Sequence, residues 1–513
     1  MLQRASAVMV LGTGSGVGKS FIAAGLCRIL SDQGIRVAPF KAQNMSNNSF
    51  VTKEGYEMAR AQAVQAQCAR VEPEVHMNPV LLKPSADSSS QVIVHGKVRG
   101  VFSAEEYYSL REKMWEAIQE SYDQLSQKHE VLVIEGAGSP AEINLKNFDI
   151  VNFRVAELAD AQCVLVGDID RGGVFAWLLG TLGLLENTER ERIAGLIINK
   201  FRGDIKLLEP GLEMLETLSH KKVLGVLPYN FDLWIEEEDA LDLERSRVQA
   251  LNNDLDIAIL LLPRISNATD FQILAKERGV SVRMIKRLEE FDSPDLLILP
   301  GTKATQADLN YLIEKGFAEK IKEYAHRGGR ILGICGGYQM LGQVIEDPDH
   351  VESGISVRAG LGLLPLRTRF SPEKILKQVR GNIRGKIFSS PVQGEIEGYE
   401  IHMGRTEIGD GTNPLFEICE DESSHWKQEG VIDASGKICG TYLHGLFDHE
   451  VFRGSFLNAL RQSAGKTNSN FETQSFSIPL VKEKNYDKLA AFIRKHLNLN
   501  FLEACSSSSS RLV

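Results

Sequence analysis

The sequence lacks long apolar runs and paired cysteines, and each of these absences excludes a class of protein. No stretch of about 18 consecutive apolar residues exists, so we expect no membrane-spanning helix. The start of the chain, Met1 to Leu11, carries one basic residue and a short apolar run, too little for a secretory signal peptide. The seven cysteines among 513 residues are scattered, with no Cys-x-x-Cys pair, which favours reduced thiols over disulfides or a structural zinc site. Together these absences predict a cytoplasmic protein.

The sequence also has no excess of basic residues. Its formal net charge is -10, which argues against an extended surface for nucleic acid, although a local basic pocket for phosphate remains compatible with it. Hydrophobic residues make up 43% and charged residues 25%, the balance of a globular protein. A chain of this length is too long for one ordinary core, so we expect two large domains.

Short apolar runs alternate with amphipathic segments in the first half of the chain. One such segment, Lys19–Asp32, has the pattern of a helix and is followed by Gly34, where a left-handed cap costs little. Strands that alternate with helices indicate a doubly wound α/β domain with a parallel sheet. The runs that we expect to be its buried strands are Ala7–Leu11, Val37–Phe40, Val131–Ile134, Cys163–Gly167 and Ile193–Ile198.

A second α/β series follows a polar stretch, which suggests where the domains divide. Its expected strands are Asp256–Leu262, Leu296–Leu299 and Arg330–Ile334. We therefore predict an α/β protein with two doubly wound domains. The predicted divisions are a synthetase domain at 1–235, a solvated acidic linker at 236–253, a second domain at 254–450, and a C-terminal extension at 451–513. The extension is expected to hold one helix near Tyr486–His496 and a disordered serine-rich tail.

A phosphate-binding loop is predicted at Gly12–Ser20, directly after the first strand and at the start of a helix. Glycines let backbone N–H groups close around phosphate oxygens, and the helix N-terminus adds positive potential. We expect Lys19 to reach the β- and γ-phosphates of ATP and Ser20 to ligate Mg²⁺. Thr13 stands where the common spelling has its first glycine. The predicted nucleotide-binding residues are Thr13, Gly14, Gly16, Gly18, Lys19 and Ser20.

Polar side chains follow three further strands, at the edge where open α/β sheets bind ligands. Glu135 ends the Val131–Ile134 strand and is a candidate for holding Mg²⁺ directly or through water. Asp168 and Asp170 come after the next strand and are candidates for metal, phosphate or acceptor contacts, with an ordinary surface turn as the alternative. Asn199 follows the Ile193–Ile198 strand, and its amide is a candidate for contacting the nucleobase.

Taken together, these residues resemble the dethiobiotin-synthetase-like group of P-loop ligases. Three longer strings, Pro39–Ser49, Glu135–Asn144 and Asn199–Asp204, are much narrower and are similar to the cobyric acid synthase family. The similarity extends from the first strand through His444. It implies that ATP activates peripheral carboxylates of a corrinoid, adenosylcobyrinic acid a,c-diamide, and that ammonia from L-glutamine converts the b, d, e and g groups to amides.

The polar string Lys41–Ser49 carries many side-chain amides and hydroxyls. That composition suits a surface that recognises carboxylates and amides, such as a corrinoid edge. The alternative is an ordinary hydrophilic loop.

A nucleophilic cysteine is predicted in the second half. Cys335 lies in Gly333–Gly337, between the Arg330–Ile334 strand and a helix-like segment at Tyr338–Val344. A tight strand-to-helix turn exposes a nucleophile, and the next backbone N–H can help to form an oxyanion hole. The helix N-terminus favours the thiolate. Pro300–Thr302, which ends another strand, is a candidate for the second oxyanion donor.

The proton carrier for this thiol must be a histidine from elsewhere in the chain. His444 and His402 are the two candidates. Cys335 with the downstream Gly-x-x-x-His444-Gly pattern resembles class I glutamine amidotransferase domains of the cobyric and cobyrinic acid synthase type, which favours His444. Members of that class carry a glutamate two residues after the histidine, where this chain has Leu446. The orienting group is therefore open: Glu400, Asp448, or a dyad without a third member.

The expected function is a glutamine-dependent ligase in which Cys335 and His444 release ammonia and the phosphate loop energises a carboxylate. Three alternatives remain open. The same chemistry could act on cobyrinic acid at its a and c groups or on a cell-wall glutamate. The chain could instead be a ParA/MinD-like switch ATPase, although those proteins usually carry a second lysine where Gly14 stands. A glutamine sensor with a degenerate glutaminase domain is the third.

Overall fold

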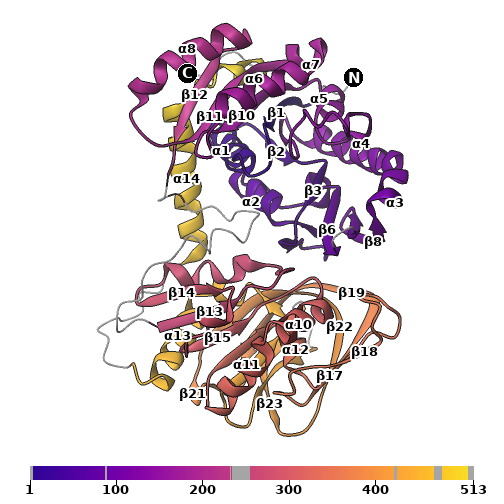
Figure 1. Ribbon diagram of the computed structural model, residues 1–513, viewed down its shortest axis with the longest axis vertical. Coiled ribbons are helices and arrows are strands. Elements are labelled where there is room, and N and C mark those ends of the chain that lie inside the picture. The colour runs from indigo at the N-terminus through magenta and orange to yellow at the C-terminus, as the bar shows by residue number, and fades with distance from the viewer. Residues whose placement is uncertain are drawn as a thin grey trace.

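The computed structural model describes residues 4–86, 89–230, 233, 255–420, 425–466 and 477–505. These residues form two α/β lobes, one from the first half of the chain and one from the second (Figure 1). The predicted linker at 236–253 and the serine-rich tail from residue 506 lie outside the described residues. No helix in the part of the chain that is described combines the length and apolarity needed to cross a membrane. Six cysteines are free and buried: Cys27, Cys68, Cys163, Cys335, Cys419 and Cys439.

A six-stranded parallel sheet forms the centre of the first lobe, in the order β12-β11-β10-β1-β9-β2. Its strands are β1 (Ser6–Gly12), β2 (Val37–Phe40), β9 (Val131–Glu135), β10 (Gln162–Asp168), β11 (Ile193–Phe201) and β12 (Val223–Pro228). The five strands predicted from apolar runs are all present, and β12 joins them at the edge. Apolar clusters cover both faces of this sheet, which is why these strands are apolar throughout.

Helices pack on both faces of the first sheet, as the doubly wound pattern predicts. Helix α1 has the predicted bounds, Lys19–Asp32, and Gly34 beyond it has a positive φ of 77°. The other helices of this lobe are α2 (Arg60–Cys68), α3 (Ala104–Ser109), α4 (Arg111–Lys128), α5 (Phe153–Leu158), α6 (Val174–Leu184), α7 (Asn187–Arg192) and α8 (Ile205–Ser219).

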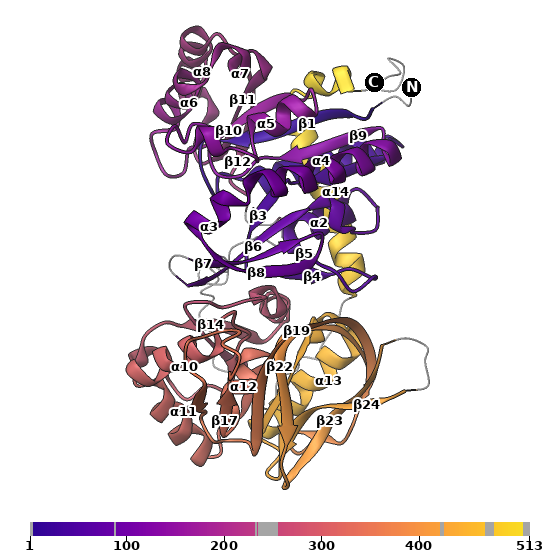
Figure 2. The same cartoon turned by 90° about the vertical axis from the view of Figure 1, so that its right-hand side faces the viewer.

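A smaller sheet that the sequence analysis missed lies on the side of the first lobe that faces the second (Figure 2). Its strands, in the order β3-β6-β7-β8, are β3 (Gln43–Met45), β6 (Val80–Ala86), β7 (Ser89–Val94) and β8 (Lys97–Ser103). A separate hairpin, β4 (Ser49–Val51) with β5 (Glu57–Ala59), lies beside it. These strands mix polar with apolar residues, so their sequence signal is weak.

The second lobe is built on a twelve-stranded mixed sheet. Its parallel part runs β14-β13-β15-β16-β25 and supplies the doubly wound architecture. These strands are β13 (Leu255–Leu260), β14 (Val280–Ile285), β15 (Leu296–Leu299), β16 (Ile331–Ile334) and β25 (Ile438–Thr441). The three strands predicted here are β13, β15 and β16. Helices α10 (Thr305–Glu314), α11 (Phe317–His326), α12 (Gly336–Leu341) and α13 (Glu450–Ser463) complete this lobe.

The sheet of the second lobe continues into an antiparallel part that the sequence analysis did not predict. Two long strands, β19 (Leu366–Ile383) and β22 (Glu395–Ile408), pair along most of their length. The remaining strands are β17 (Val344–Glu346), β18 (Val357–Ala359), β23 (Thr412–Cys419), β24 (Lys427–Asp433) and β26 (Leu443–His444). Strand β26 pairs with β22, and this pairing brings His444 to the sheet.

The C-terminal segment returns to the first lobe. Helix α14 (Ile478–His496) includes the predicted helix and packs along α1 (Figure 1). One helix is predicted for the segment 451–513. The described part of that segment also includes most of α13, whose apolar face belongs to the core of the second lobe. Gly25 of α1 allows the close approach of α14, because a Cβ there would lie 2.2 Å from Cδ1 of Ile493. The buried Arg28 adds ion pairs to Glu483 and Asp487, each at 2.6 Å.

Candidate active site

The phosphate loop lies between β1 and α1. Gly16 and Gly18 have positive φ values of 70° and 100°, a backbone conformation that favours glycine. A Cβ on Gly18 would lie 2.1 Å from Nδ2 of Asn199, so only glycine fits at that position. The Oγ1 atom of Thr13 is buried and has no hydrogen-bond partner among the described residues. The loop therefore has the glycine conformations and an unused buried hydroxyl that a bound phosphate chain would need.

Lys19, Ser20 and Glu135 meet at the base of this loop. The ammonium of Lys19 donates to the carbonyl oxygens of Gly14 at 2.7 Å and Gly138 at 3.0 Å, so it spans the loop. The Ser20 hydroxyl donates to Oε1 of Glu135 at 2.8 Å. A serine hydroxyl beside a carboxylate at the phosphate end of the loop is a donor set that suits Mg²⁺.

Glu135 is held ionised by its surroundings. Burial would raise the pKa of this carboxyl, but the ammonium of Lys41, at 2.9 Å from Oε1, lowers it below its usual range. Gln65 donates a further hydrogen bond to Oε2 at 2.5 Å. No group of three or more His, Cys, Asp or Glu side chains within the described ranges could hold a metal on its own. A metal ion here would therefore rely on phosphate oxygens and water as well as on Ser20 and Glu135.

The other predicted residues of this edge lie around the loop. Asn199 donates from Nδ2 to the carbonyl of Val17 at 2.9 Å and accepts from its neighbour's backbone N–H at 2.9 Å, so its amide supports the loop. Lys200 donates to the Gly16 carbonyl at 2.7 Å and pairs with Asp168 at 3.0 Å. Asp170 pairs with Arg202 at 2.8 Å. These groups form the wall of the loop on the β11 side.

A large pocket opens beside the phosphate loop, between it and the four-stranded sheet. Its volume is about 570 Å³, and its lining includes Ser15 of the loop and Gly138 after β9. Its walls are largely apolar and aromatic, with Tyr108 packed on Phe148 at a ring distance of 5.1 Å. The guanidinium of Arg111 lies over the same Phe148 ring at 5.2 Å. We call this cavity the acceptor pocket.

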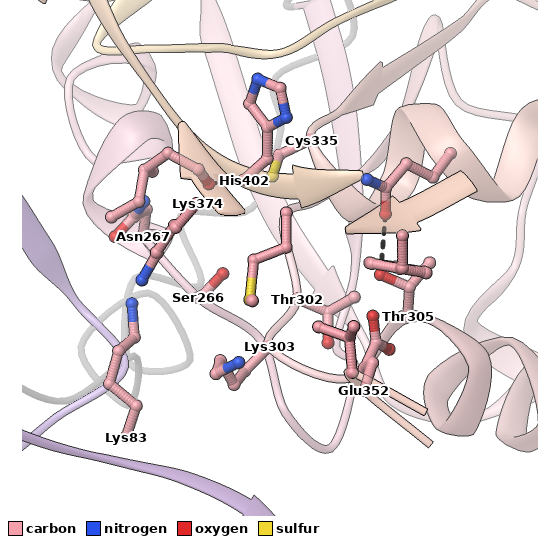
Figure 3. Close-up of a pocket in the computed structure, with 15 residues that line it drawn as sticks. Lys83, Ser266, Asn267, Thr302, Lys303, Thr305, Cys335, Glu352, Lys374 and His402 are labelled. Atoms are coloured by element: carbon pink, nitrogen blue, oxygen red, sulfur yellow. Dashed lines mark hydrogen bonds between the residues drawn. The ribbon is translucent and has the colours of Figure 1, made fainter. Parts of the chain in front are cut away.

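Cys335 lies at the turn between β16 and α12. Its φ of 49° and ψ of -106° are unfavourable for a residue with a side chain, as expected of a nucleophile on a tight turn. Gly336 lies against Thr302, because a Cβ on Gly336 would be 3.1 Å from the Thr302 backbone nitrogen. The predicted Pro300–Thr302 segment is therefore adjacent to the nucleophile. Cys335 is 7% exposed and lines a polar pocket, which we call the thiol pocket (Figure 3).

His444 lies beside Cys335 and is oriented by a carboxylate that the sequence analysis missed. Its Nδ1 is 2.6 Å from Oδ2 of Asp270, and the backbone N–H of Gly445 donates to Oδ1 of the same carboxylate at 3.0 Å. Its Nε2 is buried and has no conventional hydrogen-bond partner among the described residues. Burial would lower the pKa of His444, but Asp270, with a smaller contribution from Cys335, raises it to about 10. The arrangement is a Cys-His-Asp triad in which the imidazole is charged at neutral pH.

The two carboxylates proposed from sequence do not orient His444. Glu400 pairs instead with Lys427 at 2.8 Å, and Asp448 lies 3.9 Å from Arg60. His402, the rival histidine, lines the thiol pocket but its Nδ1 faces the Gly404 carbonyl at 2.7 Å. The orienting role therefore belongs to Asp270, which is buried beneath the imidazole. No motif surrounds Asp270, and it precedes His444 by 174 residues, so no sequence signal could have found it.

Residues of the first lobe form hydrogen bonds with the segment that carries Asp270 of the triad. The backbone N–H of Ser49 donates to Oδ1 of Asn267 at 2.9 Å, and Oδ1 of Asn48 accepts from the backbone of Ala268 at 3.2 Å. These bonds hold the short helix η3 (Ala268–Phe271) that carries Asp270. The end of the predicted polar string Lys41–Ser49 thus contacts the second lobe, while Gln43 lines the acceptor pocket.

The four-stranded sheet lies between the acceptor pocket and the thiol pocket. Successive side chains of a strand point to opposite faces, and β6 follows this rule. Leu82 and Pro84 line the acceptor pocket, whereas Lys83 between them lines the thiol pocket. The two pockets are therefore separated by one strand layer that belongs to the first lobe.

Comparison with known proteins gives a family for each half and for the whole. Residues 8–243 match the CobQ/CobB/MinD/ParA nucleotide binding domain, and residues 256–452 match the CobB/CobQ-like glutamine amidotransferase domain. The chain is 49% identical over 511 residues to cobyric acid synthase of Sorangium cellulosum, covering 97% of this chain and 98% of the relative. It is 47% identical over 499 residues to cobyric acid synthase of Alkaliphilus metalliredigens, covering 96% and 98%. A third relative, cobyric acid synthase of Pelotomaculum thermopropionicum, is 48% identical over 506 residues.

Proposed function

The chain belongs to the cobyric acid synthase family, and from this premise we propose that it amidates peripheral carboxylates of a corrinoid with ATP and L-glutamine. The acceptor is adenosylcobyrinic acid a,c-diamide, and the b, d, e and g carboxylates become amides to give cobyric acid. The observation that carries the proposal is the presence of two complete sites on one chain. A thiol triad lies on one side of a strand layer, and a phosphate loop with a roomy acceptor pocket lies on the other.

The thiol site would release ammonia from glutamine. The thiolate of Cys335 attacks the side-chain amide carbon, and the C–N bond breaks as the imidazolium of His444 gives its proton to the departing nitrogen. Water then hydrolyses the thioester to glutamate. Asp270 keeps Nε2 of His444 directed at the sulfur, because it holds the opposite ring nitrogen at 2.6 Å. We assign the stabilisation of the oxyanion to the backbone N–H groups near Gly336 and Thr302, which lie next to each other.

The phosphate loop would energise the acceptor. The γ-phosphoryl group of ATP passes to a corrinoid carboxylate, and ammonia then displaces phosphate from the acyl phosphate to leave an amide. Lys19 is placed to neutralise charge on the transferred group, and catalysis here is mainly positioning and charge stabilisation. When bound, Mg²⁺ supplies further neutralisation of the phosphate oxygens, and we assign Ser20 and Glu135 to hold it.

The acceptor pocket suits a large, mostly apolar ring with a polar rim. Aromatic walls at Tyr108 and Phe148 can pack against a macrocycle, and Arg111 offers a cation to its carboxylates.

The division between the sites can be tested with one substitution in each. Cys335→Ala should abolish amidation driven by glutamine but retain amidation driven by an ammonium salt, because only the nitrogen source is lost. Lys19→Met should abolish amidation with both nitrogen donors and retain glutamine hydrolysis. The measurement is mass spectrometry of the corrinoid after incubation with ATP, Mg²⁺ and either donor, which follows successive acid-to-amide mass changes. Equal loss with both donors in Cys335→Ala, or no amidation by the unaltered protein, would overturn the proposal.

A further inference from the structure

The thiol pocket carries more charge than the release of ammonia needs. Besides Cys335 its lining includes Lys303, Glu352, Lys374 and, from the first lobe, Lys83 (Figure 3). The triad acts only on the amide end of glutamine. The opposite end of that substrate carries an α-ammonium and an α-carboxylate, so a selective site must offer one group of each sign.

Lys303 and Glu352 line the thiol pocket without forming a direct ion pair with each other. Within the described ranges, no ion pair at 4.0 Å or less links Lys303 or Glu352 to a side chain of opposite charge. Burial raises the pKa of Glu352 to about 8, and burial also lowers the pKa of Lys303. Glu352 is fixed in place by the backbone N–H of Gln306, which donates to Oε1 at 3.0 Å. A ligand ammonium beside Glu352 would lower its raised pKa, and a ligand carboxylate beside Lys303 would raise its lowered pKa.

A second cation reaches the pocket from the first lobe. Lys83 donates to Glu57 and to the Ser49 hydroxyl, each at 2.8 Å. Lys374 of the second lobe forms an ion pair with the other oxygen of Glu57. Two buried ammonium groups therefore share one carboxylate, which leaves an excess of positive charge on this side of the pocket.

Figure 3 shows how these groups lie relative to the nucleophile. Cys335 and His402 are at one side of the pocket, and Lys303, Glu352 and Lys83 are at the other. Lys83 and Lys374 direct their ammonium groups toward one another from the two lobes. The pocket thus has a reactive sulfur at one end and separated charges of both signs at the other.

We infer that Glu352 binds the α-ammonium of glutamine and that Lys303, with Lys83 from the synthetase lobe, binds its α-carboxylate. This assignment rests on the proposed function and adds the residues that select the amino-acid end of the substrate. Because Lys83 is supplied by β6, the glutamine site is complete only when the two lobes are joined. The same strand lines the acceptor pocket with Leu82 and Pro84, so one element borders both substrates.

The test compares kcat/KM for the hydrolysis of three amides by the full-length protein. Glutamine has both head groups, glutaramic acid (the monoamide of glutaric acid) lacks the α-amino group, and 4-aminobutanamide lacks the α-carboxylate. We expect Glu352→Gln to reduce the preference for glutamine over glutaramic acid by about 30-fold or more, the effect of removing one partner of a buried charged contact. The preference of the Glu352→Gln variant for glutamine over 4-aminobutanamide should change much less. Lys303→Met and Lys83→Met should show the reverse pattern.

Matched substitutions on the exposed face of α11, Lys322→Met and Glu319→Gln, should leave all three preferences unchanged. Amidation driven by ammonium salt reports whether the synthetase lobe of each variant remains folded, and Lys303→Arg should restore part of the lost preference. If the unaltered protein hydrolyses glutamine and the variants keep its preferences, or lose all three substrates equally, the assignment is overturned. If the unaltered protein hydrolyses no glutamine, the proposed function itself fails.

Discussion

At the scale of single residues, Asp270 decides what His444 can do. The 2.6 Å contact fixes the imidazole, and the buried negative charge keeps it protonated, with a pKa raised to about 10. Tyr399 stacks on the opposite face of the ring at 5.4 Å, so the imidazole has little freedom to turn. A carboxylate two residues after the histidine is therefore not needed at this site.

Asp270→Asn should keep the shape of the triad and remove its charge. We expect kcat for glutamine hydrolysis to fall by about 10²- to 10⁴-fold. In the unaltered protein the imidazolium loses its proton only as the pH approaches about 10, so activity should decline on the alkaline side near that value. Without the aspartate charge the pKa of His444 falls, and the alkaline decline should move about 1–3 units lower. The measurement is a pH profile of kcat/KM for glutamine.

Asp448→Asn is the matched control, since Asp448 does not contact His444. It should leave both the rate and the pH profile close to those of the unaltered protein. A normal rate in Asp270→Asn would show that the cysteine and histidine act as a dyad.

At the scale of elements, the β4–β5 hairpin joins the lobes through buried charge. Glu57 on β5 is fully buried and pairs with Lys83 at 2.8 Å in its own lobe and with Lys374 of β19 in the other. Burial alone would raise the pKa of Glu57, but the two lysines lower it strongly. The hairpin also accepts a hydrogen bond from Gln378 of β19 to the Val51 carbonyl at 2.7 Å. The contact between the lobes is thus specific in charge as well as in shape.

Glu57→Gln should destabilise the protein by about 3–5 kcal/mol, because it leaves two buried ammonium groups without their carboxylate. Burial already lowers the pKa of Lys374 to about 7, despite the opposing effect of Glu57. Without Glu57 the pKa of Lys374 falls further, so the folded variant loses a proton that the unaltered protein keeps below about pH 7. The deficit should therefore be largest below pH 7 and smaller above it. Urea unfolding at several pH values measures both effects.

Glu72→Gln removes one partner of the exposed Lys53–Glu72 pair and serves as the control, with an expected loss below about 1 kcal/mol. Equal losses in the two variants would contradict the role given to the buried cluster.

At the scale of the whole molecule, the two lobes place two reactions on either side of one strand layer. The first lobe provides the phosphate loop, the acceptor pocket and the layer itself, and the second lobe provides the thiol triad. Helix α14 crosses back from the second lobe to pack along α1, so the first lobe is covered in part by a segment that follows the second lobe in sequence (Figure 1).

The aromatic walls of the acceptor pocket should contribute to corrinoid binding. Tyr108→Ala and Phe148→Ala should each weaken corrinoid binding by about tenfold or more, since each removes an aromatic wall that a ring can cover. Both side chains are more than a third exposed, so their loss should cost little stability. Equilibrium dialysis followed by the visible absorbance of the corrinoid measures the affinity. Trp426→Ala, an exposed aromatic of the second lobe, should have no effect, and unchanged affinity in both pocket variants would place the corrinoid elsewhere.

The sequence alone determined the features that are contiguous in the chain. Buried parallel strands are apolar runs, so β2 and β15 could be predicted to the residue. A phosphate loop needs glycines, a lysine and a serine within one short segment, and a nucleophile on a turn needs glycines beside it. For that reason the local pattern is enough to identify Lys19 and Cys335. The local pattern alone leaves His444 and His402 as candidates, and only the resemblance to class I glutamine amidotransferase domains favours His444.

Contacts between residues that are far apart in the sequence became known only from the folded structure. Asp270 reaches His444, Lys83 enters the thiol pocket, and Glu57 binds Lys374, although none of these residues lies in a motif. The four-stranded sheet that separates the pockets has strands of mixed polarity, which carry little periodic signal. A side chain far away in sequence gains its role from the burial, charge and hydrogen bonds that folding creates around it. This burial and these contacts form only on folding, so they cannot be recognised from a short segment of the sequence.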